Sequence, residues 1–188
     1  LWGQNEWRWT PWFRSIVGLR GDVYNFTVDS NLAANSGKAN DQMVTPKLSL
    51  VFGPWQKTEF YLNYGHGFHS NDARGTTITQ EPGTGNAVDK VKPLVRTKGY
   101  EIGLRSEFVP GWQSTVALWQ LNAASELVFV GDAGTTEASR PSSRYGFEWT
   151  NLYVMTDWLA FDADLAWSHA RFRDADPVGQ YIPGAVTA

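Results

Sequence analysis

The chain has 188 residues, a net charge of −3 and no cysteine. The length suffices for one domain, the charge offers no basic footprint for nucleic acid, and disulfides and thiolate metal sites are excluded. No apolar run approaches the roughly 20 residues that a transmembrane helix needs. Aromatic residues make up 14% of the chain, and 18 glycines and 9 prolines punctuate it. This composition favours an all-β protein of many strands.

Tryptophans crowd the start of the chain. The stretch Leu1–Pro11 holds Trp2, Trp7 and Trp9, and Trp12 follows it directly. Indole is a large apolar ring with a single N–H to satisfy, so it suits a boundary between water and an apolar phase. We therefore interpret this stretch as an interfacial anchor.

Alternation of apolar and polar residues predicts seven strands. It is clearest around Tyr100, Ile102 and Leu104, which alternate with Glu101 and Arg105. Because successive side chains on a strand point to opposite sides, each such run has one apolar and one charged face. The predicted strands are Phe13–Val28, Val44–Phe52, Glu59–Gly65, Leu94–Phe108, Gln113–Leu121, Ser143–Met155 and Leu159–Arg171.

The fifth predicted strand has two possible phases. In one phase, Val116 and Leu118 form the apolar face. In the other, the apolar face consists of Ala117, Trp119 and Leu121. The sequence also allows this strand to continue through Glu126–Val130.

The connections between the predicted strands alternate strictly in length. Residues 29–42, 66–93, 131–142 and 173–184 form long polar connections, and residues 53–58, 109–112 and 156–158 form short turns. Up-and-down outer-membrane barrels have this rhythm, whereas the Greek-key connections of soluble sandwiches mix lengths. The charged faces also exclude a dry core between two sheets. We therefore predict an all-β, antiparallel up-and-down meander that is part of a large transmembrane β-barrel, with its apolar face toward lipid and its charged face toward the lumen.

Several stretches resemble the barrel region of TonB-dependent receptors, which are outer-membrane transporters of Gram-negative bacteria. The similarity spans roughly Val44 to Gly184 and rests on Asn63–Gly75, Lys98–Phe108, Ala117–Trp149 and Ser168–Phe172. The resemblance implies a ~22-stranded barrel that a separate plug domain closes, with transport driven through TonB. It also implies an outer-membrane location, contact with outer-membrane lipid, and no enzymatic activity or cofactor.

The chain departs from the whole receptor in three ways. Nothing in it resembles the plug or the TonB-contacting segment, seven strands are about a third of the expected barrel, and the last residue, Ala188, is not the aromatic residue on which such proteins usually end. We therefore expect residues 1–188 to form a partial barrel domain that needs further strands, because an open sheet leaves two unpaired edges.

Four residues are candidates for ligand binding in an extracellular loop: His66, His69, Asp72 and Arg74. Two imidazoles and a carboxylate are plausible contacts for a metal or an iron chelate, but their spacing is no recognised zinc signature, and we predict no resident metal. The alternative is a loop start in which Asn and Asp side chains form turn hydrogen bonds.

Four further residues are candidates for the lumen or for plug contacts. Glu101 with Arg105 and Arg144 with Glu148 are spaced i,i+4 on the charged faces of two strands. We expect each to form a pair that contacts a plug or lines a solute path. The alternative is a charge ladder that satisfies a wet barrel interior.

The sequence thus predicts a barrel-wall segment of a TonB-dependent receptor that takes up a scarce nutrient, such as an iron–siderophore complex. Its expected partners are its own plug domain, the TonB complex and a small-molecule ligand. Two alternatives stay open: a soluble or surface β-domain that binds carbohydrate through tryptophan, and a small complete outer-membrane barrel of about eight strands.

Overall fold

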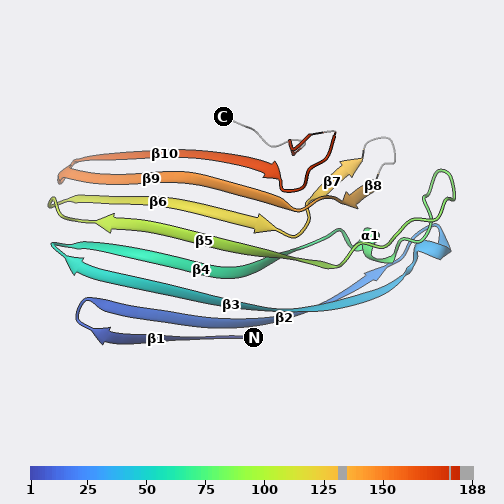
Figure 1. Cartoon of the computed structure of the whole chain (residues 1–188), viewed down its shortest axis with the longest axis horizontal. Helices are drawn as coiled ribbons and strands as arrows, with labels where there is room; N and C mark the ends of the chain where they lie inside the picture. Colours follow the sequence, from blue (N-terminus) through green and yellow to red (C-terminus); the bar gives the residue numbers. More distant parts are fainter. Residues whose placement is uncertain (131–134, 178, 183–188) are drawn as a thin grey trace.

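The computed structural model describes residues 1–130, 135–177 and 179–182, and its dominant feature is a single eight-stranded antiparallel sheet (Figure 1). The strands lie side by side in chain order, and a separate two-stranded hairpin, β7–β8, lies between β6 and β9 in the sequence. The strands of the sheet are β1 (Trp2–Thr10), β2 (Phe13–Val28), β3 (Gly37–Trp55), β4 (Thr58–Ser70), β5 (Leu94–Ser106), β6 (Trp112–Ala123), β9 (Ser142–Thr156) and β10 (Leu159–Phe172). The smaller elements are η1 (Ala33–Asn35), α1 (Ala73–Thr77), β7 (Leu127–Val130) and β8 (Thr135–Ala138).

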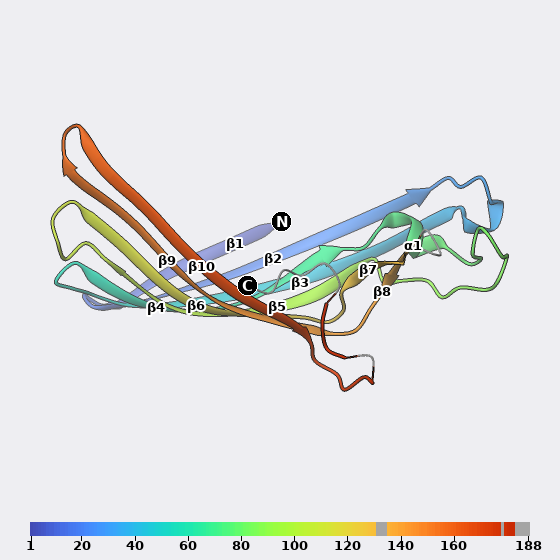
Figure 2. The same ribbon diagram turned by 90° about the horizontal axis from the view of Figure 1, so that it is seen from above.

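Short turns lie at one end of the sheet and long connections at the other, which confirms an up-and-down meander (Figure 1). In the β3–β4 turn, Gln56 and Lys57 have φ values of 50° and 59°. Two successive positive φ values are typical of the tight hairpin turns whose twist matches that of the flanking strands. The sheet is strongly twisted, so that β10 crosses the direction of β2 when the sheet is seen from above (Figure 2).

Strand register divides the sheet into an apolar face and a polar face. The apolar face is the one that carries Leu62 and Ile102, which are cross-strand partners. The polar face carries Glu59 and Arg105, which are also partners. Members of the apolar face across the sheet include Val17, Leu19, Leu48, Leu50, Phe60, Leu62, Ile102, Leu104, Val116, Leu118, Phe147, Trp149, Leu165 and Trp167.

The register also decides the phase of β6. Val116 pairs with Leu104 and Leu118 pairs with Ile102, so both lie on the apolar face. Ala117 and Trp119 therefore lie on the polar face. The chain does not continue straight from β6 into β7, because Ala124 and the residues after it leave the sheet.

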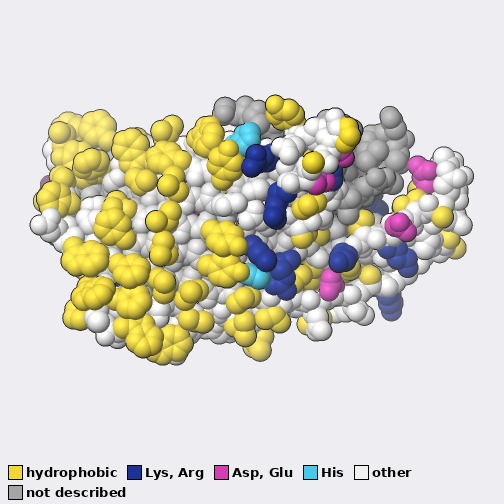
Figure 3. All heavy atoms as spheres, viewed as in Figure 1, with side chains coloured by type: hydrophobic (Ala, Val, Ile, Leu, Met, Phe, Trp, Pro, Cys, Tyr) yellow, Lys and Arg dark blue, Asp and Glu magenta, His cyan; other side chains and the backbone are white. Residues whose placement is uncertain are grey.

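The sheet has no conventional core. Large apolar side chains remain exposed on the apolar face, for example Ile102 at 54% and Leu165 at 56% of their surface, whereas the buried apolar residues are few and scattered. No second layer of the described residues covers this face, which is yellow over much of Figure 3. Burial of such side chains is favourable by about 25 cal/mol per Å², so this face requires an apolar phase to cover it.

No helix within the described residues has the length and apolarity that crossing a membrane requires.

Aromatic rings mark two levels along the strands. One tryptophan lies in or beside each short turn: Trp12, Trp55, Trp112 and Trp158. The rings of Trp12 and Trp55 stack with centroids 6.2 Å apart. The second level holds Tyr64, Tyr100 and Tyr145, with Tyr64 and Tyr100 5.2 Å apart.

These two levels enclose an apolar band. The six residue steps from Thr58, the partner of Trp55, to Tyr64 on β4 span about 20 Å of strand, or about 15 Å of depth at the usual tilt of barrel strands. Aromatic girdles flank the apolar band of outer-membrane barrels on both sides. The order of the rings along the strands therefore matches a lipid-facing wall.

Two predictions about strands need correction. The stretch Leu1–Pro11 is not only an interfacial anchor: its residues from Trp2 to Thr10 form β1, which pairs with β2 and makes eight strands where the sequence predicts seven. Strands β3 and β4 also extend into segments that the sequence predicts as loops, since β3 begins at Gly37 and β4 ends at Ser70. In each case the backbone of the segment pairs with a neighbouring strand, and this pairing holds the segment extended. Polar side chains do not prevent such pairing. Residues 131–134 of the predicted loop 131–142 lie outside the described residues.

Two glycines on the polar face make room for aromatic rings. Tyr61 pairs with Gly103 and Trp119 pairs with Gly146, and each ring lies over the glycine. A Cβ on Gly103 would collide with the ring of Tyr61. A Cβ on Gly146 would lie 2.6 Å from Trp119 Cζ2 and 2.6 Å from the backbone oxygen of Trp167. Both glycines therefore serve close packing across the sheet.

Replacing Gly146 by alanine should destabilise the sheet by about 1–3 kcal/mol, because the added methyl group meets backbone as well as an aromatic ring. Gly103→Ala should cost less, since Tyr61 is a side chain that can turn away. The measurement is urea unfolding, followed by tryptophan fluorescence, of the protein that carries this chain, folded in detergent micelles. Gly21→Ala is the control because nothing lies within 4 Å of its added Cβ. Equal effects at Gly146 and Gly21 would contradict the packing role.

Candidate functional site

The sheet opens between β3 and β4 at the end that carries the long connections. Their pairing ends at Lys47 and Gly65. Pro46, the next residue of β3 in this direction, has no N–H to donate. Beyond this point β3 pairs with β2 alone and β4 pairs with β5 alone, so two hairpins diverge from a common wall.

A cavity of about 1170 Å³ lies where these hairpins diverge. Its walls come from the end of β2, the start of β3, the 71–93 connection and the start of β5. Charged side chains are frequent in the lining: Asp29, Asp41, Arg74, Asp89, Lys90, Lys92 and Arg96. The cavity thus combines the strand ends with the longest connection in the described chain.

Buried polar contacts fix the walls of this cavity. Asn35, which is 6% exposed, accepts hydrogen bonds at Oδ1 from the backbone N–H groups of Thr79 (2.9 Å) and Gln80 (3.0 Å). The backbone N–H of Leu94 donates to Asp41 Oδ2 at 3.2 Å. These bonds fasten the 71–93 connection to the β2–β3 hairpin. No sequence signal identified Asn35, since it is one asparagine within a polar connection.

The four predicted ligand contacts do not converge. His66 and His69 lie on β4 and not in a loop, on opposite faces because their positions differ by an odd number. Asp72 caps the N-terminus of α1, where its Oδ1 accepts from the backbone N–H of Arg74 at 2.9 Å. Of the four, only Arg74 lines the cavity. The structure therefore places only part of this set in a loop, and ligand binding by these residues stays a prediction.

Asp72 and Arg74 instead form a local ion pair with Nη2 and Oδ2 2.6 Å apart. The hydrogen bonds from the Arg74 side chain hold the pKa of the Asp72 carboxyl below its usual value. Because the pKa is lowered in the fold, the stabilising effect of this cap is present above the ordinary carboxyl pKa. It is lost as the pH falls through the lowered value.

His66 takes part in a network that bridges the open seam. Arg96 Nη1 donates to the backbone oxygen of Val44 on β3 (3.0 Å) and to His66 Nδ1 (2.7 Å). A guanidinium has no acceptor, so Nδ1 must accept and Nε2 must carry the hydrogen that Tyr64 Oη receives at 2.6 Å. Both ring nitrogens of His66 therefore have hydrogen-bond partners within the sheet. Within the described residues, no three His, Cys, Asp or Glu side chains gather as a metal site.

The polar face holds all four predicted lumen residues, but with other partners than the sequence predicts. Residues i and i+4 of a strand are about 13 Å apart, so Glu101 cannot pair with Arg105, nor Arg144 with Glu148. Glu101 instead accepts from Asn63 Nδ2 at 3.1 Å. These residues are therefore not paired with each other along the strand, and their contact with a plug or a solute path stays a prediction.

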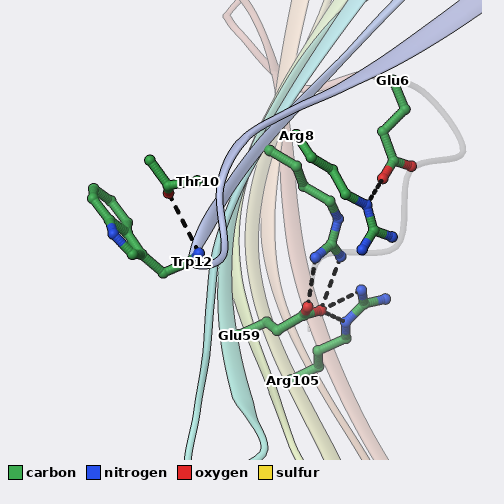
Figure 4. Close-up of polar contacts among 7 residues, drawn as sticks. Glu6, Arg8, Thr10, Trp12, Glu59 and Arg105 are labelled. Carbon is green, nitrogen blue, oxygen red and sulfur yellow. Dashed lines mark hydrogen bonds and ion pairs between the residues drawn. The ribbon is translucent and has the colours of Figure 1, made fainter.

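Ion pairs on the polar face join different strands, a strand and a connection, or positions two apart on one strand, as in Arg20 with Asp22 (2.7 Å). Arg144 contacts Glu126 at 3.0 Å. Glu59 lies between two arginines, with Arg14 Nη1 2.7 Å from its Oε1 and Arg105 Nε 2.7 Å from its Oε2 (Figure 4). The side chain of Glu59 is only 15% exposed, so the two guanidinium groups supply most of its solvation. This cluster joins β2, β4 and β5 near the short turns.

The family described as "TonB dependent receptor-like, beta-barrel" matches residues 1–186. The chain belongs to this family. Comparison with curated protein sequences finds no significant match.

Solved structures share the fold of this family member. The copper transporter OprC superposes with a TM-score of 0.68 at 19% identity, over 91% of this chain and 28% of its own. The siderophore receptor PiuA from Acinetobacter baumannii superposes with a TM-score of 0.64 at 20% identity, over 92% of this chain and 26% of its own. The alcaligin outer-membrane receptor FauA from Bordetella pertussis superposes with a TM-score of 0.65 at 14% identity, over 93% of this chain and 30% of its own. The chain thus spans between a quarter and a third of the length of these receptors.

Replacing Glu59 by glutamine should lower the free energy of unfolding by about 1–2 kcal/mol, because it leaves Arg14 and Arg105 facing each other without a carboxylate. Urea unfolding in detergent micelles measures the change. Glu148→Gln is the matched control: it removes the same charge from the polar face, and in the described part of the chain its side chain has no hydrogen bond or ion pair. An equal loss in both variants would assign the effect to net charge.

Proposed function

We propose that this chain is a wall segment of an outer-membrane receptor that takes up a scarce nutrient, with an iron–siderophore complex as the preferred ligand class. The observation that carries the proposal is the cavity of about 1170 Å³ at the end with the long connections. Long connections face the exterior in outer-membrane barrels, so this cavity would open toward incoming ligand.

The cavity carries charges of both signs, since Asp29, Asp41 and Asp89 line it beside Arg74, Lys90, Lys92 and Arg96. Arg74 is neutralised by Asp72. Lys90 and Lys92 line the cavity, and in the described residues neither ammonium group has an ion-pair partner. They are available to a carboxylate or catecholate group of a chelate. Several similar structures are siderophore receptors by name, which agrees with this ligand class.

The polar face supports a role in enclosing a plug domain. Glu101, Arg105, Arg144 and Glu148 all point to this side, where a barrel has its lumen. The outer edges of β1 and β10 have no strand partner among the described residues, and a membrane sheet must close. Further strands and a plug coupled to TonB would complete the transporter.

Uptake of a radiolabelled ferric siderophore tests the proposal. The complete gene that encodes this chain would be expressed in a Gram-negative strain that lacks its own siderophore receptors, and a panel of siderophores would be supplied. Uptake should require both the gene and TonB. Lys90→Gln/Lys92→Gln should reduce uptake at low ligand concentration by about tenfold, because two cations leave the cavity.

Lys57→Gln, in a short turn at the opposite end of the sheet, is the control variant and should leave uptake unchanged. Surface labelling of the receptor would confirm equal amounts in the membrane. Absence of uptake for every iron chelate in the panel, with the receptor present at the surface, would overturn the proposed ligand class.

A further inference from the structure

The charges of the sheet are distributed unequally between its two faces. All acidic residues in the eight strands, every one of which lies in the described residues, have the register of the polar face: Glu6, Asp22, Asp41, Glu59, Glu101, Glu148, Asp162 and Asp164. The apolar face carries only cations, at Lys38, Arg96, Lys98 and Arg171. The charged Lys, Arg, Asp and Glu side chains that the eight strands place on this face are therefore all positive.

These cations all lie on one side of the apolar band. Lys98 and Arg171 come one register position beyond Tyr100 and Tyr145, toward the long connections. In Figure 3 the Lys, Arg and His side chains of this face gather where the hydrophobic surface ends. The short-turn end of the face shows tryptophans instead. The cations thus mark one membrane interface and not the other.

Lys98 and Arg171 belong to one continuous row across four strands. The register aligns Lys98 with Asn122, Asn122 with Ser143, and Ser143 with Arg171. Three strand spacings separate the two cations, which is about 14 Å between backbones. Because both side chains are long and exposed, they can converge on a group that lies over Asn122, which is partly exposed.

The row presents hydrogen-bond donors. Gln120 Nε2 donates to Asn122 Oδ1 (3.3 Å) and to Ser143 Oγ (3.2 Å). These bonds occupy acceptor positions and leave the amide hydrogens of Asn122 available, whereas Ser143 is buried at 8% exposure. In the described chain neither Lys98 nor Arg171 has a carboxylate partner. Arg96 and His66, by contrast, are engaged with Val44 and Tyr64.

We propose that Lys98, Asn122 and Arg171 bind the phosphate headgroup of an anionic membrane lipid, in the leaflet next to the long connections. Two cations and a neutral donor match phosphate oxygens, which are acceptors only, and the apolar side chains directly below would contact the acyl chains. The proposal rests on insertion of the proposed receptor into the outer membrane. It does not depend on which nutrient the receptor takes up.

Native mass spectrometry of the complete receptor in detergent tests this site. The protein would be incubated with equal amounts of phosphatidylglycerol, which is anionic, and phosphatidylcholine, which is zwitterionic. Phosphatidylglycerol adducts should exceed phosphatidylcholine adducts by more than about tenfold, because two cations each strengthen binding about fivefold. Lys98→Gln/Arg171→Gln should reduce this preference by tenfold or more, since each cation near a membrane surface strengthens binding of an anionic lipid about fivefold.

Lys47→Gln/Lys57→Gln is the matched control. It also removes two positive charges, one from the polar face and one from a short turn, and should retain the preference. An excess of inorganic phosphate should displace little phosphatidylglycerol, because it has no acyl chains. Equal binding of both lipids, an equal loss in the control variant, or full displacement by inorganic phosphate would each overturn the lipid site. If iron uptake fails while lipid preference persists, only the proposed function falls.

Discussion

The structure depends on one constraint: a sheet with an apolar face that its own chain does not cover. Side chains such as Ile102 and Leu165 remain more than half exposed, and a soluble domain would bury them against a second layer. Lipid can take the place of that layer only if every backbone N–H and C=O within the bilayer has a partner. Antiparallel pairing between consecutive strands meets this requirement for the strands inside the sheet. The meander, the girdles and the tight turns all follow from this constraint.

The polar face must accommodate charged groups and large aromatic rings against a single sheet. Charges are neutralised across strands, as Glu59 shows by contacting Arg14 and Arg105. Aromatic rings are accommodated over glycine, as Trp119 is over Gly146. Both devices connect neighbouring strands through their side chains. They stiffen the wall from the side that a plug would contact.

The candidate cavity arises where the membrane constraint ends. Beyond Lys47 and Gly65 the hairpins separate, which is acceptable only where water or protein can satisfy the freed backbone groups. One such group is the backbone oxygen of Val44, which accepts a hydrogen bond from Arg96 across the seam. The same end of the sheet carries the cations of the apolar face. The end of the β3–β4 pairing, the positive charges of the apolar face and the candidate cavity therefore lie at one level of the wall.

The sequence by itself determined the fold class, the faces of most strands and the rhythm of long and short connections. These properties are local, since alternation and turn residues act within a few positions. The tertiary structure alone decided what depends on register. It made a strand of the tryptophan-rich start, set the phase of β6 through Leu104 and Ile102, and paired Arg105 with Glu59. It also separated His66 from Asp72, because β4 remains paired with β5 as far as Ser70. A strand's partner supplies its hydrogen bonds and its cross-strand side-chain contacts, and no single segment encodes that partner.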